Sequence, residues 1–318
     1  MKKDIFTYVN KEDNIMFSKL EKKDLQKILD YIGEYYLEYR NILGVNNNDT
    51  FGVEIENDSI SKNDMNKKIS QYDELKEWQA KYDPSIENGC EVISNVLYDT
   101  DSDWKKLYLM CQKMKDGKID DNCGAHVHVG AQIIDNEKTL LKFIGLWARY
   151  EKVFFRFTNG EFIRPRASII KHATPVAAIF KKYFKSNNSG SFILGRESLD
   201  RCKAVNLSNV YKINKYDFHN TIEFRTPNGT LNPIIWQNNI NTFIKLLEYC
   251  KKVDELPFDD YKLTRYDLYN KIYLEDALEL CDTIFDNNLD KVYFLKQYLK
   301  NFENSNEVKS VKLTRYLY

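Results

Sequence analysis

The sequence predicts an α+β fold, in which a curved antiparallel β-sheet presents a polar concave face and is backed by helices. Three short segments, 51–56, 124–130 and 221–226, each alternate apolar residues with residues that can carry chemistry. Such alternation is typical of strands with one face against the core and one face away from it. Apolar residues at helical spacing over 137–155 and 233–250 indicate the helices that back the sheet.

The length of the chain allows one large core or two domains. Its 318 residues contain no Gly/Ser-rich or Pro-rich linker, which favours one large catalytic unit with added helices. We therefore expect an N-terminal helical extension over 1–50, a catalytic domain over 51–253 and a C-terminal helical extension over 254–318.

The charge and cysteine content limit the classes of partner and compartment. The 47 basic and 47 acidic residues cancel, which gives no bulk electrostatic reason to expect a nucleic-acid or membrane partner. The first residues lack the apolar segment of a signal peptide, and no window approaches the roughly 18 apolar residues of a membrane span. The six cysteines are scattered without a CxxC pair, as in a cytoplasmic protein with reduced thiols.

The strand predicted at 51–56 carries two carboxylates on one face. Glu54 and Glu56 lie two residues apart, so their side chains share a face at a separation of roughly 7 Å. Together they could hold one or two hard cations through oxygen. The simpler alternative is a solvated outer face on an edge strand.

A second predicted strand carries two of the four histidines of the chain, His126 and His128. Their spacing again places both side chains on one face, and a neutral imidazole is a common metal ligand and proton carrier. Two half-exposed histidines on an ordinary strand remain the alternative.

The third predicted strand repeats the arrangement with Glu223 and Arg225, while Ile222 and Phe224 point to the other side. Random surface polarity would not favour carboxylates and imidazoles so strongly over Lys, Thr and Ser. If the three polar faces line one concavity, they supply ligands suited to Mg²⁺ or Mn²⁺ and a guanidinium for phosphate.

Four other residues are candidates for the same site. Glu91 lies in an apolar strand at 90–94, where a carboxylate must be exposed at an edge or held by a partner. Arg164 and Arg166 could clamp phosphate or carboxylate, although a basic surface loop also explains them. Asn206, in a short strand at 205–207, is expected to face the site and contact the cofactor.

Local signals predict where several helices begin. Ser18-Lys19-Leu20-Glu21 has the form of a capping box, which predicts a helix as far as Tyr39, with Gly44 as its stop. Residues 57–75 and 186–191 are polar and are expected to be loops. Asn136 and Asn232 are predicted N-caps of long helices, and the remaining helices are expected at 103–114, 273–285 and 289–302.

Taken in order, three motifs resemble those of the amidoligase family. They are Gly-Val-Glu-Ile-Glu at 52–56, Cys-Gly-Ala-His-Val-His-Val-Gly at 123–130, and Thr-Ile-Glu-Phe-Arg-Thr-Pro-Asn-Gly-Thr at 221–230. Asp83-Pro84-Ser85 followed by 89–94 is similar to a further element of the family. The family comprises carboxylate–amine ligases with a glutamine synthetase-like catalytic fold, related to glutamate–cysteine ligases. The resemblance covers roughly residues 51–250.

The resemblance implies roles for most of the candidates. Glu54 and Glu56 would be metal ligands, Glu91 would complete one metal site, and His126 with Glu223 would help to hold the metal nearer the phosphates. His128 would lie near the nucleotide or the transferred phosphate, Arg225 would neutralise that phosphate, and Arg164 and Arg166 would supply basic groups before the next helix. Glutamine synthetases have a richer set of acidic ligands, and only Glu91 is found here for that part.

The implied activity is that of an ATP- and Mg²⁺-dependent ligase. ATP would convert a carboxylate into an acyl phosphate, since hydroxide and oxide are poor leaving groups, and an amine would then displace phosphate to give an amide or isopeptide bond. Small-molecule or peptide acids and amines are the expected substrates, but the motifs specify neither their identity nor an oligomeric state.

Two other classes of function remain open on the sequence alone. His126 and His128, with His172 and His219, have the composition of a binuclear metal-dependent hydrolase. In hydrolases of this class the His-x-His pair usually opens the first strand of a (β/α)₈ barrel. Here about 120 residues precede the pair, which argues against this class. A non-catalytic nucleotide- or peptide-binding relic of the fold is the other alternative. Dependence on ATP distinguishes the three.

Overall fold

The computed structural model describes residues 14–120, 122–186, 201–210, 217, 219–263 and 272–300. These residues form an α+β structure around one six-stranded sheet with the order β2-β3-β1-β4-β6-β5. The strands are β1 (Phe51–Asn57), β2 (Gln79–Lys81), β3 (Cys90–Ile93), β4 (Ala125–Gly130), β5 (Val205–Asn206) and β6 (Thr221–Phe224). Each neighbouring pair is antiparallel and the sheet is not closed, which confirms the predicted α+β class and antiparallel pairing.

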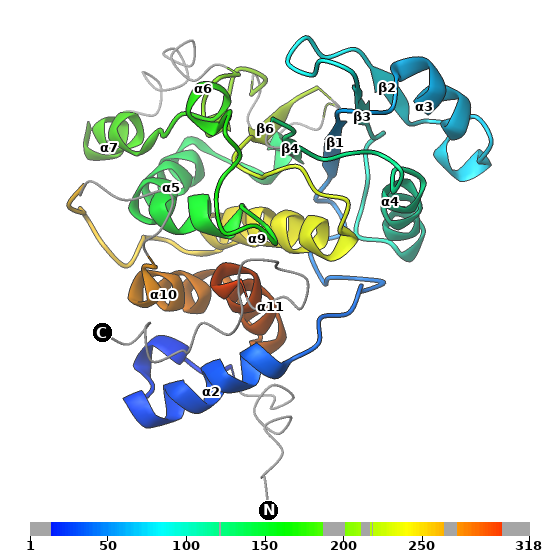
Figure 1. Ribbon diagram of the computed structural model, residues 1–318. Helices are drawn as coiled ribbons and strands as arrows, with labels where there is room; N and C mark the ends of the chain where they lie inside the picture. The colour runs from blue at the N-terminus through cyan, green and yellow to red at the C-terminus, as the bar shows by residue number, and fades with distance from the viewer. Residues whose placement is uncertain are drawn as a thin grey trace, which may run out of the picture.

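The helices lie around and beneath this sheet in Figure 1. The α-helices are α2 (Lys22–Glu34), α3 (Lys62–Ile69), α4 (Asp101–Lys113), α5 (Glu137–Phe157), α6 (Ile169–His172), α7 (Ala177–Ser186), α9 (Pro233–Lys252), α10 (Leu274–Ile284) and α11 (Asn288–Leu299). Short 3-10 helices are η1 (Phe17–Lys19), η2 (Asp73–Leu75) and η3 (Ala131–Ile133). None of the described helices is both long enough and apolar enough to span a membrane.

The apolar face of the sheet packs on α5 and α9. On β6, the Phe224 ring stacks on Phe243 of α9 with 4.0 Å between centroids, and it contacts Trp147 of α5 at 5.5 Å. All three side chains are fully buried, so burying them contributes several kcal/mol of hydrophobic free energy by area. Because the helices cover this face, the polar residues of the same strands are left on the opposite face.

The two predicted N-caps on the covering helices are confirmed. The Asn136 side chain accepts a hydrogen bond from the Thr139 backbone N–H, and α5 begins at Glu137. The Asn232 side chain accepts from the Ile234 backbone N–H, with Pro233 at the first helical position of α9. These caps fix the helices on which the sheet rests.

Two local predictions were wrong. Ser18 does not cap a helix, because α2 begins at Lys22 after Glu21 and ends at Glu34, well before Tyr39. Residues 57–75 are not all loop, since α3 lies among them with the Ser61 side chain accepting from the Asp64 N–H. The strongly polar composition of α3 concealed Met65 and Ile69, its two buried residues.

Helix α7 was not predicted either. Its N-terminal N–H groups at Val176 and Ala177 donate to the buried carboxylate of Glu151 on α5. That partner lies about 25 residues away in the sequence, so no local cap indicated the helix. The polar loop expected at 186–191 falls almost wholly outside the described residues.

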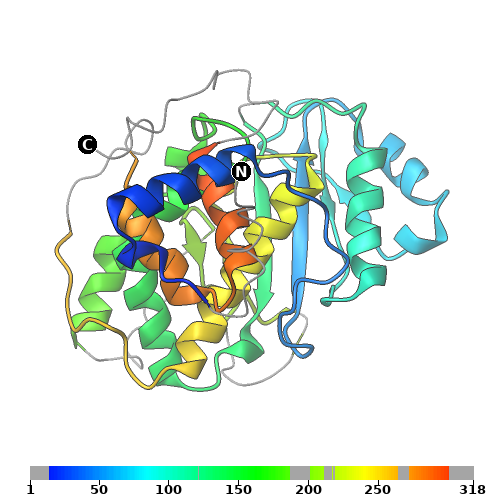
Figure 2. The same ribbon diagram turned by 90° about the horizontal axis from the view of Figure 1, so that it is seen from below.

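The two terminal regions form a third layer beneath α5 and α9. Figure 1 shows α2, α10 and α11 below α5 and α9, and in Figure 2, seen from below, these three helices lie together at the front. Buried apolar residues of 14–50, of the central region and of 272–300 belong to one hydrophobic cluster. The helical extensions on either side of 51–253 therefore share a core with the predicted catalytic domain.

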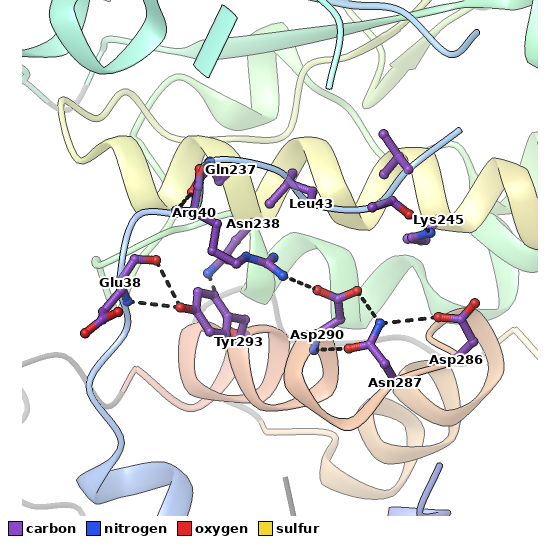
Figure 3. Close-up of polar contacts among 12 residues, drawn as sticks. Glu38, Arg40, Leu43, Gln237, Asn238, Lys245, Asp286, Asn287, Asp290 and Tyr293 are labelled. Atoms are coloured by element: carbon purple, nitrogen blue, oxygen red, sulfur yellow. Dashed lines mark hydrogen bonds and ion pairs between the residues drawn. The ribbon is translucent and has the colours of Figure 1, made fainter. Parts of the chain in front are cut away.

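A chain segment after α2 is held between α9 and α11, as Figure 3 shows. The Arg40 guanidinium donates to Asp290 on α11 at 2.7 Å, and the Arg40 N–H donates to Gln237 on α9 at 2.9 Å. The Tyr293 hydroxyl bonds both the N–H and the carbonyl of Glu38 at 3.0 Å. These contacts fix the segment that connects the helical layer to β1.

Candidate active site

The strand register brings the predicted site residues together on the polar face. Glu56 of β1 lies directly opposite Glu91 of β3. On the other side of β1, Glu54 lies opposite His126 of β4. Residues opposite one another in an antiparallel pair have Cβ atoms about 5 Å apart, so these pairs are in contact range.

These cross-strand pairs of polar residues continue across β4 to β5, at the edge of the sheet. His128 lies opposite Glu223 of β6, and Glu223 lies opposite Asn206 of β5. Side chains contributed by five strands thus form one band across the sheet. The closeness expected of Glu54, Glu56, His126 and Glu223 is observed, although the outermost two are 169 residues apart.

His126 lies at the centre of the band and is only 3% exposed. Its Nδ1 donates to Glu54 Oε2 at 2.8 Å and lies 3.7 Å from Glu223 Oε1. Its Nε2 lies 3.6 Å from Glu56 Oε1. One imidazole therefore touches the carboxylates of both predicted metal positions.

His128 lies two residues after His126 on β4 and contacts the same carboxylate, that of Glu54. Its Nε2 lies 3.0 Å from Glu54 Oε1, and its Nδ1 lies 3.2 Å from the Thr221 hydroxyl. Burial alone would lower the pKa of His128, but Glu54 and then Glu223 outweigh it and raise that pKa to about 9. In turn, the two histidines outweigh burial and hold the pKa of Glu54 well below its usual range.

The acidic end of the band lacks enough positive charge from the protein. Burial, followed by the charges of Glu54 and Glu56, raises the pKa of Glu91 to about 9. A carboxyl group in that position must hold a proton or face a cation. The donor set, carboxylate oxygens with imidazole nitrogens, fits Mg²⁺ or Mn²⁺.

Ligand atoms gather in three overlapping groups, in each of which they lie within 4.8 Å of one another. The groups are Glu54 with Glu91 and His126, Glu54 with His128 and Glu223, and Glu56 with Asp83 and Glu91. Within the described part of the chain, all three groups lie between Glu54 and Glu223. They place His128, rather than only His126, beside Glu223.

Asp83 is the acidic residue that sequence reasoning missed. It lies in the turn before β3, where its Oδ1 accepts from both the N–H and the hydroxyl of Ser85 at 2.6 Å. A carboxylate oxygen of Asp83 lies within 4.8 Å of ligand atoms of Glu56 and Glu91. An Asp-Pro-Ser turn has the same sequence whether or not its carboxylate serves a site, so only its place beside Glu56 indicates a role.

Arg225 lies at the edge of the band, where it forms an ion pair with Glu223 through one terminal nitrogen. Its Nε donates to the carbonyl of His172 at 3.3 Å. Among the described residues, the second terminal nitrogen has no recorded hydrogen-bond partner. The guanidinium is therefore held in place while one of its donors stays available for an anion.

The two arginines predicted to clamp an anion lie in different environments. Arg166 is buried, and its two terminal nitrogens donate to the carbonyls of Pro227 at 2.6 Å and Arg225 at 2.9 Å. It thus buttresses the end of β6. The side chain of Arg164 is exposed and makes no recorded contact with the band among the described residues, so its assignment to the site remains a prediction.

Asn206 is buried beside Glu223 and donates to its Oε2 at 2.6 Å. Its own side-chain oxygen accepts from the N–H and the hydroxyl of Ser208. Both ends of the amide are engaged by the protein, so the geometry favours orienting Glu223 over contacting the cofactor.

Two pockets lie at opposite ends of the strands, one on each side of the band. One of them, which we call the strand-end pocket, has a volume of about 340 Å³ and is lined by Gly52, Glu54, Ser94, His128 and Thr221. The remaining lining residues are Thr50, Phe51, Val53, Lys81, Ile93, Asn95, Val96, Gly130, Asn209, Asp217 and His219. The turn pocket, about 440 Å³, is lined by Pro84, Ser85, Asn122, Ala167, Ser168, Lys171 and His172. The strand-end pocket thus reaches Glu54 and His128 of the band, and the turn pocket is lined by Pro84, the neighbour of Asp83.

The inventory of a binuclear hydrolase is not assembled. Neither His172 nor His219 belongs to a ligand group within the described residues. His172 lines the turn pocket and His219 the strand-end pocket, so the band separates them.

Comparison with known proteins gives the family. No curated protein matches the chain. The model of a family described as "Putative amidoligase enzyme" matches residues 55–247, which is more than half of the 318 residues. The match includes Glu56, Glu91, both strand histidines, Glu223 and Arg225. The chain therefore belongs to this family of amidoligase enzymes, whose description is that of an amide-bond-forming ligase.

Proposed function

We propose that the protein is an ATP-dependent carboxylate–amine ligase with a glutamine synthetase-like catalytic fold. It activates a carboxylate as an acyl phosphate and joins it to an amine, giving an amide or isopeptide bond. The observation that carries the proposal is the band itself: carboxylate and imidazole ligands next to Arg225, on one sheet face, between two pockets.

We assign nucleotide binding and metal binding to different residues of the band according to their positions. The strand-end pocket adjoins His128 and Glu54 and is the proposed nucleotide site, with His128 toward the phosphates. Glu54, Glu56, Glu91, His126 and Glu223, with Asp83, would hold Mg²⁺ or Mn²⁺. The metal, when bound, supplies positive charge to the phosphates.

Arg225 faces the place where the phosphoryl group would pass from ATP to the acid. Phosphoryl transfer spreads negative charge over the equatorial oxygens, so a fixed guanidinium there stabilises the transition state more than the bound nucleotide. Glu223 and His172 hold the guanidinium, and Arg166 supports the backbone from which it projects. Asn206 keeps Glu223 in place.

The free thiols and the charge balance suit a cytoplasmic enzyme, which is the compartment we propose. All six cysteines are free, and five are buried. Small-molecule or peptide acids and amines are the proposed substrates, with neither nucleic acid nor membrane as a partner.

Transfer of a heavy-oxygen label tests the reaction. Acid and amine pairs are first screened with ATP and Mg²⁺ for release of ADP, and the active acid is then labelled in its carboxylate oxygens. Label is expected in the released phosphate, because the acyl phosphate keeps one carboxylate oxygen as its bridge. Turnover without ATP, or phosphate free of label, would show that the carboxylate is not activated and that the ligase proposal is wrong.

Millimolar Mg²⁺ or Mn²⁺ should raise the melting temperature of the purified protein. A ligand at about 100 times its Kd stabilises the folded state by about 2.7 kcal/mol, and for a chain of this size that amounts to a shift on the order of 5 °C. Glu56→Gln should abolish most of the shift. The variant should be no less stable than the wild type without metal, because one buried negative charge has been removed.

The control for this measurement is Asp101→Asn, which alters an exposed carboxylate paired with Lys105 on α4. That variant should keep the full metal shift. Equal melting temperatures with and without metal in the wild type would exclude the metal site, and an unchanged shift in Glu56→Gln would exclude Glu56 as a ligand.

A further inference from the structure

We propose that the turn pocket is where the amine substrate reaches the acyl phosphate, and that His172 is the base that takes a proton from its ammonium group. This inference rests on the proposed ligase function. It assigns a catalytic role to a histidine that lies outside the band and outside every ligand group found among the described residues.

The segment that carries His172 is fixed to the catalytic strands at both ends. At its start, the Ser168 hydroxyl donates to the carbonyl of Asn122, just before β4. At its end, the carbonyl of His172 accepts from Nε of Arg225. The same guanidinium pairs with Glu223, so the position of His172 is linked to the place of phosphoryl transfer.

The opposite wall of the turn pocket leads to the acidic end of the band. Pro84 and Ser85 line the pocket, and the Ser85 hydroxyl and N–H both bond Asp83. Asp83 lies with Glu56 and Glu91 in one ligand group. The turn pocket is therefore lined on one side by His172, whose carbonyl holds Arg225, and on the other by Ser85, which holds Asp83. It lies on the side of the band away from the proposed nucleotide site.

His172 is chemically suited to accept a proton, unlike the two strand histidines. His126 and His128 are both engaged by carboxylates. The side chain of His172 is half-buried and has no recorded hydrogen bond or ion pair with the described residues. Burial, then Lys171, Arg166 and Arg225, lower the pKa of His172, with only Glu56 opposing them. The imidazole is thus neutral near pH 7.

The same cations act on the incoming amine. Lys171, Arg166 and Arg225 disfavour an ammonium group in the pocket as they disfavour an imidazolium. An amine that enters protonated must therefore lose its proton there, and its lone pair is needed for attack. A base held at the pocket wall meets both requirements.

Amide formation then proceeds with His172 as the base. One ammonium proton passes to a ring nitrogen of His172, and the freed nitrogen lone pair forms the bond to the acyl carbon. The bond between that carbon and the phosphate oxygen breaks with its electron pair on the oxygen, which leaves as phosphate. The second nitrogen proton passes to the departing phosphate or to water, and the imidazolium returns its proton to water.

A comparison of two nucleophiles tests this role. The assay contains ATP and Mg²⁺ with a mixture of the twenty protein amino acids, succinate and glutarate as acid probes. The amine probe is either ethylamine or hydroxylamine, which is a much weaker base and is already unprotonated at pH 7. For His172→Asn, amide formation with ethylamine should fall about a hundredfold, the usual size of general-base catalysis. Hydroxamate formation should stay within about threefold.

Each possible result of the two-nucleophile comparison supports or overturns the role of His172 as a base. Equal losses with both nucleophiles would show a positional role, and no loss with either would show no role, so both results overturn the inference. No ADP release and no product from the wild type with any probe would refute the ligase function and the inference with it. Equal melting temperatures confirm that the variant is folded, and His172→Gln provides a second variant of closer size.

The pH profile gives a matched pair of variants. Lys171→Met removes the positive charge next to His172, so the acid limb of the ethylamine rate should move to higher pH. Lys182→Met removes an exposed lysine from α7 and should leave the limb in place. If the acid limb lay at the same pH in both variants, a group other than His172 would determine its position.

Discussion

Replacement of Arg225 by alanine is expected to lower turnover by about a hundredfold while the affinity for ATP stays within about tenfold. Loss of one preorganised partner of a developing charge typically costs on the order of 3 kcal/mol. The guanidinium is 14% exposed and already fixed by Glu223 and His172, so it needs no reorganisation when the phosphoryl group arrives. Steady-state turnover and binding of a fluorescent ATP analogue measure the two effects separately.

Arg225→Lys should recover only part of the lost turnover. A lysine ammonium is a compact charge without the planar fork, so it cannot pair with Glu223 and contact a phosphate oxygen in the same geometry. Full activity in Arg225→Lys would show that charge alone matters. Equal losses in turnover and in ATP affinity would show that Arg225 binds the ground state rather than the transition state.

Arg149→Ala provides a matched control for the loss of a guanidinium. Arg149 on α5 also forms an ion pair, with Glu279 on α10 at 3.0 Å, but that pair lies on the layer of helices beneath the sheet. Its removal should change stability by less than about 1 kcal/mol and should leave turnover unchanged.

The polar band could be predicted from sequence because it depends on a period of two. Glu54 with Glu56 and His126 with His128 occupy alternate positions of a strand, and Arg225 follows directly after the strand that carries Glu223, so each pair has one expected shared face. The antiparallel register then leaves little freedom in how those faces meet. The caps at Asn136 and Asn232 were predictable for a similar reason, since each cap contacts residues two or three positions away.

The residues that the sequence did not reveal depend on contacts between distant segments. Asp83 is a candidate ligand only because Glu56 and Glu91 lie beside it, and these residues approach it only after the sheet forms. Arg166 is a candidate anion clamp from the sequence, yet its two terminal nitrogens donate to carbonyls 59 and 61 residues away. Spacing along the chain specifies which face a side chain occupies, but not which backbone group it meets.

The N-terminal segment shows the same limit for the fold. Ser18 was expected to cap a helix, but its backbone N–H donates to Asp282 on α10 at 2.7 Å. The Phe17 N–H donates to the other oxygen of that carboxylate at 2.9 Å. A partner 264 residues away thus replaces the local capping box and ties the start of the described chain to its last helices.

Removal of the Asp282 carboxylate should cost about 3–5 kcal/mol of unfolding free energy, the usual cost of breaking a buried ion pair. Asp282 and Lys291 pair at 2.7 Å with side chains that are 2% and 0% exposed. In Asp282→Ala, the Lys291 ammonium would keep only the Ile15 carbonyl as a recorded acceptor, and two backbone N–H groups would lose theirs. Denaturant unfolding measures the loss, and a thermal scan should show a fall on the order of 8 °C.

Second variants separate the charge from the hydrogen bonds. Asp282→Asn should also be destabilised, because its NH₂ group would face a backbone N–H or the ammonium. Asp282→Ala combined with Lys291→Met removes the uncompensated charge and should recover part of the loss, but not the bonds to Phe17 and Ser18. Asp24→Ala breaks an exposed pair with Lys27 and should leave the unfolding transition almost unchanged. A similarly small cost for Asp282→Ala would mean that the N-terminal segment is not held to the C-terminal helices by this carboxylate, and that apolar packing alone joins the two ends of the fold.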